Sequence, residues 1–77
     1  MNAFHVDHVI THLGGIETRQ HGSHRVYEVS SHGQRYETIV PQHHGDLPDG
    51  TLHSIERDLE PALGPGWLYT THHHLHG

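Results

Sequence analysis

The sequence predicts an α+β fold in which one helix precedes a three-stranded antiparallel sheet and a second helix follows it. Apolar residues recur at helical spacing near both ends of the chain, and β-branched and aromatic runs separated by turns lie between them. With 77 residues, 31% of them apolar, the chain can form one small domain. Short helices and three-stranded sheets need mutual packing, so both helices are expected on one sheet face, leaving the other face open.

The first helix is predicted over residues 3–13. Asn2 can cap its start, and the pair Gly14–Gly15 can end it. Its apolar residues recur every three or four positions and form one stripe: Val6, Val9, Ile10 and Leu13. A helix this short must pack on another element to be stable.

Three strands are predicted over residues 16–21, 24–29 and 35–40. The dipeptide Gly22–Ser23 is a turn signal between the first two strands, and residues 30–34 read as a hairpin loop. Pro41 ends the third strand because proline cannot donate to a strand ladder. Together these segments predict an antiparallel meander.

A loop by composition, residues 42–50, leads to the second helix. Either Asp49 or Thr51 is expected to cap this helix, and Pro61 is expected to end it near Glu60 or to bend it there. Its apolar residues have spacings of three and four: Leu52, Ile55, Leu59 and Leu63.

The chain is expected to divide into a domain over residues 1–63 and a histidine-rich tail over 64–77. In the tail, the run Trp67–Leu68–Tyr69 can pack back on the domain, whereas the last eight residues are expected to stay clear of it. No apolar run reaches the roughly 18 residues of a membrane span, so a soluble cytoplasmic protein is expected.

The composition is unusual in its cations: the chain has 13 histidines, 4 lysine plus arginine residues and a net charge of −5 with histidine neutral. Cysteine is absent, which excludes disulfides, thiolate metal sites and cysteine nucleophiles. Because free imidazoles gain charge near pH 6.5, full protonation would reverse the sign of the net charge. The histidines could bind metal, perform acid–base chemistry or serve as polar surface.

A glycine turn delivers His24 to the first position of a strand, with Ser23 before it. Arg19, Arg25 and Arg35 lie close in sequence, and arginine offers a planar fork of donors to phosphate. A histidine fixed beside phosphate-binding groups can move the protons that metal-independent RNA cleavage requires. A polar hairpin with a surface histidine explains the same residues.

Three segments in this order and spacing resemble the HicA family of mRNA-interferase toxins from bacterial toxin–antitoxin pairs. They are Gly22-Ser23-His24-Arg25-Val26-Tyr27, then Val40-Pro41 with His43-His44, and Leu47-Pro48-x-Gly50-Thr51-Leu52-x-Ser54-Ile55. A short helix followed by Gly14-Gly15-Ile16 and Arg19-Gln20 fits the same family, so the resemblance covers roughly residues 5 to 60.

The resemblance implies a fold similar to double-stranded RNA-binding domains, cleavage of translated RNA without a cofactor, and neutralisation by a HicB-type antitoxin. It assigns His24 as the catalytic histidine and Gly22 as the turn residue. Phosphate contacts are expected from these residues: Arg19, Ser23, Arg25, Arg35, His43 and His44. The chain departs from the family in having His21 and His53 where lysine or arginine is common. RNA binding is therefore expected to strengthen as the pH falls.

Two other functions stay open: a module of the same fold that binds RNA or protein without cutting, and a histidine-rich metal-binding protein. His8 and His12 are four residues apart and could share a metal, but no acidic third ligand lies between them. The tail cluster can hold a divalent metal loosely, and we expect this binding to be incidental. Its members are His72, His73, His74 and His76.

Overall fold

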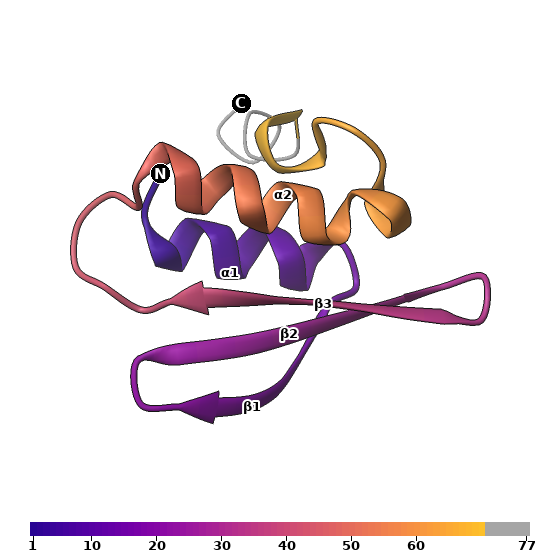
Figure 1. Cartoon of the computed structure of the whole chain (residues 1–77), viewed down its shortest axis with the longest axis horizontal. Helices are drawn as coiled ribbons and strands as arrows, with labels where there is room; N and C mark the ends of the chain where they lie inside the picture. The colour runs from indigo at the N-terminus through magenta and orange to yellow at the C-terminus, as the bar shows by residue number, and fades with distance from the viewer. Residues whose placement is uncertain (71–77) are drawn as a thin grey trace.

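The structure, a computed structural model, describes residues 1–70 and has the predicted order of elements (Figure 1). They are α1 (Ala3–His12), β1 (Ile16–His21), β2 (His24–Ser31), β3 (Gln34–Pro41) and α2 (Asp49–Leu63). Both helices lie on one side of an antiparallel sheet with the order β1-β2-β3, so the α+β prediction is confirmed.

Two tight hairpins set the register of the sheet. His32 and Gly33 alone join β2 to β3, and both have positive φ, +53° and +77°, as a type I′ turn requires. The loop predicted over residues 30–34 is therefore too long, because this turn lets the ladder close at Ser31 and Gln34. Between β1 and β2 the register shifts at Thr18, which is the extra residue of a β-bulge.

Helix α1 has the cap and the apolar stripe that its sequence predicts. The Asn2 side chain accepts a hydrogen bond from the backbone N–H of His5 at 2.9 Å. Val6, Val9 and Ile10 are fully buried against the sheet and α2. The helix stops at His12, one residue before the predicted end.

Helix α2 differs from the prediction at both ends. Pro48 is the residue before the helix and no side chain caps it, so the expected cap by Asp49 or Thr51 is wrong. The helix also continues through Pro61 to Leu63. Proline in the last turn removes only one intrahelical bond, and the Gly64 N–H closes the end by donating to the Glu60 carbonyl at 2.8 Å.

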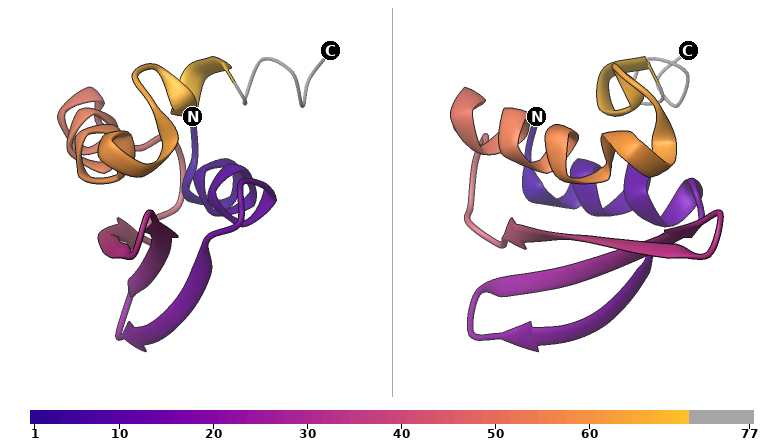
Figure 2. Two further views of the ribbon diagram at one scale, coloured as in Figure 1. Left: turned by 90° about the vertical axis from the view of Figure 1, so that its right-hand side faces the viewer. Right: turned by 45° about the vertical axis from the view of Figure 1, so that its right-hand side comes forward.

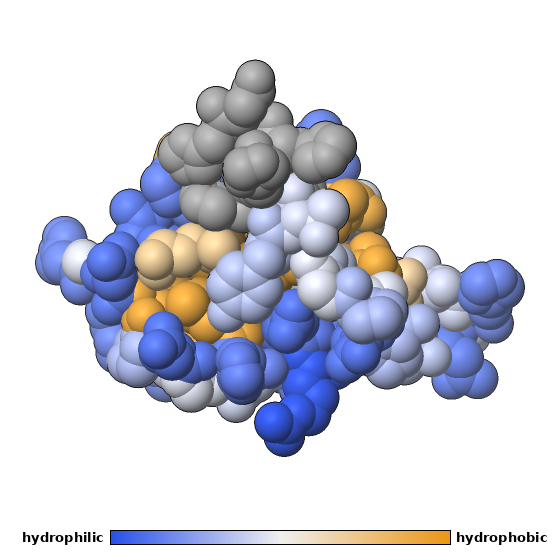
Figure 3. Space-filling view, turned by 90° about the horizontal axis from the view of Figure 1, so that it is seen from above, coloured by the Kyte–Doolittle hydropathy of each residue, from blue (hydrophilic) through white to orange (hydrophobic). Residues whose placement is uncertain are grey.

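The core lies between the sheet and the helices and includes two side chains from beyond α2. Trp67 is 4% exposed and Leu68 is fully buried, and the Trp67 indole N–H donates to the Glu56 carbonyl at 2.9 Å. The predicted division after residue 63 stays a prediction. Seen from the helix side, hydrophilic surface surrounds smaller apolar areas (Figure 3). Among residues 1–70, no helix is both long and apolar enough to span a bilayer.

The helices cover the sheet unevenly. In the left view of Figure 2, α2 lies over β3, and α1 lies next to α2 on the same side of the sheet. Strand β1 extends away from both helices. All six residues of β1 are exposed. The side of the sheet away from the helices is uncovered in the described chain, as predicted.

Candidate functional site

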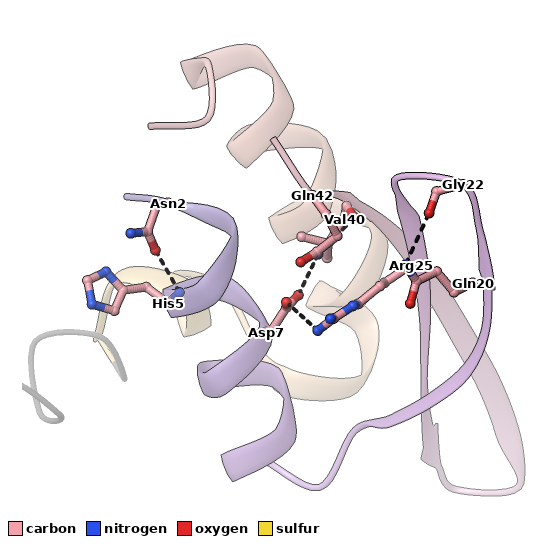
Figure 4. A network of polar contacts seen from close by, with 8 residues as sticks. All are labelled: Asn2, His5, Asp7, Gln20, Gly22, Arg25, Val40 and Gln42. Carbon is pink, nitrogen blue, oxygen red and sulfur yellow. Dashed lines mark hydrogen bonds and ion pairs between the residues drawn. The ribbon is translucent and has the colours of Figure 1, made fainter. Parts of the chain in front are cut away.

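The turn at Gly22 and Ser23 places His24 at the beginning of β2. Gly22 has φ +58°, a conformation that glycine adopts without strain and other residues rarely adopt. The side-chain amide of Gln20 donates to the Gly22 carbonyl at 3.0 Å and braces the turn (Figure 4). Because only two residues separate the strands, His21 and His24 are direct cross-strand partners, and both are exposed.

The strand register puts His24 on the uncovered side of the sheet, which we call the open face. Its residues are Ile16, Arg19 and His21 of β1, His24, Val26, Glu28 and Ser30 of β2, and Arg35, Glu37, Ile39 and Pro41 of β3. Ile16 is 67% exposed and Ile39 is 51% exposed. The open face therefore combines two adjacent imidazoles with exposed apolar side chains.

Arg19 is the arginine that shares the open face near His24. Its Nη2 lies 3.5 Å from Oε1 of Glu37, and both side chains are about half exposed. This ion pair reaches from β1 to β3 across β2, where Val26 is buried. An exposed pair of this kind is worth under about 1 kcal/mol, so a phosphate could compete with Glu37 for the guanidinium.

Arg25 points to the opposite side of the sheet, toward α1. Its Nη1 donates to Oδ2 of Asp7 at 3.2 Å, and Gln42 Nε2 donates to Oδ1 of the same carboxylate at 3.2 Å (Figure 4). Burial raises the pKa of Asp7 above its usual value, although Gln42 and Arg25 act in the other direction. This network ties α1, β2 and the loop after β3 together.

The network also positions the loop that carries His43 and His44. The backbone N–H of Gln42 donates to the Ser23 carbonyl, so the loop begins directly beside the turn that precedes His24. Both loop histidines are exposed. The structure therefore brings the turn, His24 and the start of this loop to one end of the sheet.

Arg35 is not brought to this end. It pairs with Ser30, six residues beyond His24 along β2. At 3.3 Å per residue this separation is about 20 Å. Arg35 could contact only a different part of an extended ligand that also reached His24.

The described residues contain no group of three histidine, aspartate or glutamate side chains placed to hold a metal ion. His8 stacks with Phe4, their ring planes 10° apart and their centroids separated by 6.4 Å. The predicted tail cluster, His72 to His76, lies outside the described residues.

A family model, the HicA toxin of bacterial toxin–antitoxin systems, matches residues 5–60. The chain belongs to the HicA toxin family. Its resemblance to this family in sequence is thus confirmed, and the match contains α1 from His5 onward, the whole sheet and α2 up to Glu60. A search of curated proteins gives no match.

In this HicA-family chain, the sequence did not predict the part played by Asp7 and Gln42. They are 35 residues apart, and nothing local to either indicates that one carboxylate accepts from both Gln42 and Arg25. The pairing of His21 with His24 could have been inferred from the sequence, because the residues that flank a two-residue turn are cross-strand partners.

Proposed function

We propose that this HicA-family toxin is an endoribonuclease that cleaves mRNA, with His24 as its principal acid–base group. The observation that carries the proposal is the pair His21 and His24, two exposed imidazoles at directly opposed positions beside the phosphate-binding candidates of the turn and loop. Metal-independent cleavage needs one group that accepts a proton and one that donates a proton.

In the proposed reaction, an imidazole nitrogen of His24 takes the proton of the nucleophile, a ribose 2′-hydroxyl or a water. The nucleophile's oxygen bonds to phosphorus, and the bond to the leaving oxygen breaks. That oxygen takes a proton from a second imidazole, for which His21 is the candidate nearest in register and His43 or His44 are alternatives. Arg19 and the backbone of the turn would face the negative charge on the non-bridging oxygens of the phosphate.

Arg25 and Arg35 enter this proposal differently. The Arg25 side chain is 37% exposed and is held by Asp7, so it would bind phosphate only along the α1 side of the sheet. Arg35 would meet RNA beyond the scissile group. No cofactor takes part in the proposed reaction.

The proposed partners are mRNA and a HicB-type antitoxin. The open face exposes Ile16 and Ile39 on either side of the strand that carries His24. An antitoxin that buried these apolar side chains would cover the histidine at the same time. Loss of RNA cleavage when the product of an adjacent small reading frame is added would support this partnership.

The test of cleavage compares purified wild type with His24→Ala on a labelled RNA, in buffer containing EDTA. We expect His24→Ala to lower the cleavage rate by about 10²- to 10⁴-fold and to relieve growth arrest on induction. His12→Ala is the matched control, because His12 is an exposed histidine at the end of α1, outside the open face, and it should keep the wild-type rate. Unchanged cleavage by a folded His24→Ala, or cleavage that EDTA stops, would refute the proposal.

A further inference from the structure

A groove lies between β3 and α2, separate from the turn that carries His24. Its cavity volume is about 330 Å³. Its lining residues are Glu37, Thr38 and Ile39 of β3 and Thr51, Ser54, Ile55 and Asp58 of α2. Alternate side chains of a strand point to opposite faces, so three consecutive lining residues mean that the groove follows the backbone edge of β3.

This edge of β3 carries unpaired hydrogen-bonding groups. The Gln42 N–H donates to Ser23, which fixes the alternation of bonded and non-bonded pairs along the β2–β3 ladder. By that alternation Thr38 bonds to β2, whereas the N–H and C=O groups of Glu37 and Ile39 point outward. No other strand of the described chain pairs with this edge.

The outward groups form a short template for one more strand. Pro41 is the next outward position and has no N–H, so pairing must stop there. On the other side of the groove, α2 presents two small hydroxyl side chains, Thr51 and Ser54, which leave room for incoming side chains.

The charge of the groove selects its occupant. Glu37 and Asp58 are the acidic residues of its lining, and no lining residue is cationic. Because the Glu37 carboxylate is paired with Arg19 on the open face, the negative charge of the groove rests on Asp58. Asp58 accepts the hydroxyl hydrogen of Thr38 at 2.9 Å and has no ion-pair partner among residues 1–70. An acidic groove repels phosphate and favours lysine or arginine.

We propose that this groove binds an extended peptide segment of a partner protein, which adds to β3 as a fourth strand and directs a lysine or arginine side chain to Asp58. Backbone bonds to Glu37 and Ile39 supply the register, and the carboxylate selects a basic sequence. The proposal does not depend on RNA cleavage, since the groove contains neither His24 nor any residue of the turn.

The probe is a blocked pentapeptide of alternating valine and arginine, titrated into ¹⁵N-labelled full-length chain. We expect chemical-shift changes confined to residues 37–39 and 51–58, and slower hydrogen exchange of the Glu37 and Ile39 amides. Asp58→Asn keeps an acceptor for Thr38 but removes the charge, and should weaken binding about two- to fivefold. Glu60→Gln makes the same change in charge on α2 outside the groove and should bind as wild type does.

Two further peptides separate strand addition from simple charge attraction. One peptide carries N-methyl groups on its odd-numbered residues and the other on its even-numbered residues. Only one of these two sets of amides faces β3, so one peptide should lose binding and the other should keep it. Absence of binding at millimolar peptide, equal binding of these two peptides, or no effect of Asp58→Asn would overturn the proposal. Two other results would also overturn it. The first is slower hydrogen exchange of the Glu37 and Ile39 amides at higher protein concentration without peptide, which would assign the edge to a second copy of the chain. The second is a change in the chemical shifts of the groove residues on addition of oligouridine.

Discussion

Replacing Leu68 by alanine is expected to destabilise the whole domain, although this residue lies beyond α2. Leu68 is fully buried in the core. The substitution removes three buried carbons, worth about 0.8 kcal/mol each, and leaves a cavity, so the free energy of unfolding should fall by about 2–5 kcal/mol. A chain of this length is expected to have roughly 4–12 kcal/mol in total, at 0.05–0.15 kcal/mol per residue.

Urea unfolding measures this change, followed by far-UV circular dichroism and by the fluorescence of Trp67, the single tryptophan. Both signals should give one transition, displaced to lower urea in Leu68→Ala. Leu68→Met keeps the volume and should lose less than about 1.5 kcal/mol, while Thr70→Ala, at an exposed position, should stay within about 0.5 kcal/mol of wild type. A loss below 1 kcal/mol in Leu68→Ala, or fluorescence that changes before dichroism, would refute the reasoning.

Three other measurements test the packing and the charges. Burial raises the pKa of Asp7 above its usual 3.8, so the folded chain binds this proton more tightly than the unfolded chain does. The stability that this proton contributes is lost as the pH rises above 3.8 through the folded pKa. Urea titrations should therefore show wild type losing stability relative to Asp7→Asn over that range, and a constant difference between the two would contradict this prediction. Gly15→Ala should lose about 1–3 kcal/mol because its Cβ would overlap the Ile10 side chain, but Gly50→Ala, with open space around it in α2, should melt at the wild-type temperature or above. Affinity of His24→Ala for a labelled RNA, measured by fluorescence anisotropy, should rise as the pH falls from about 7.5 to 6, and a flat curve with the fold intact would count against a binding role for the histidines.

The fold was predictable because its signals are local. The stripe in α1, the glycine turn before His24 and the β-branched residues of β2 and β3 each act within a few positions. The wrongly predicted features are the two ends of α2, where local preferences compete with tertiary packing. Asp49 can cap a helix, but the backbone enters α2 from Pro48, so Asp49 is the first helical residue. Pro61 disfavours a helix, but so near the end of α2 it removes only one intrahelical hydrogen bond.

The candidate site was predictable in part for the same reason. A two-residue turn determines where His24 begins its strand, so its position followed from sequence. The direction in which Arg25 points follows from strand alternation only once the covered face is known, and its Asp7 partner lies 18 residues away in α1. The distance of Arg35 from His24 likewise depends on the register of β2 and β3, which needs the whole sheet.

The uncovered position of β1 has a consequence for the dynamics of the site. This strand has no buried residue, and its attachment to the body is mainly the backbone ladder with β2. Segments with few apolar contacts open at low free energy, so β1 should detach before the rest of the sheet and show the fastest amide exchange of the three strands. Arg19 and His21 belong to this strand. A ligand that holds them against β2 must therefore first stop their fluctuation, and its affinity is reduced by the entropy of that ordering.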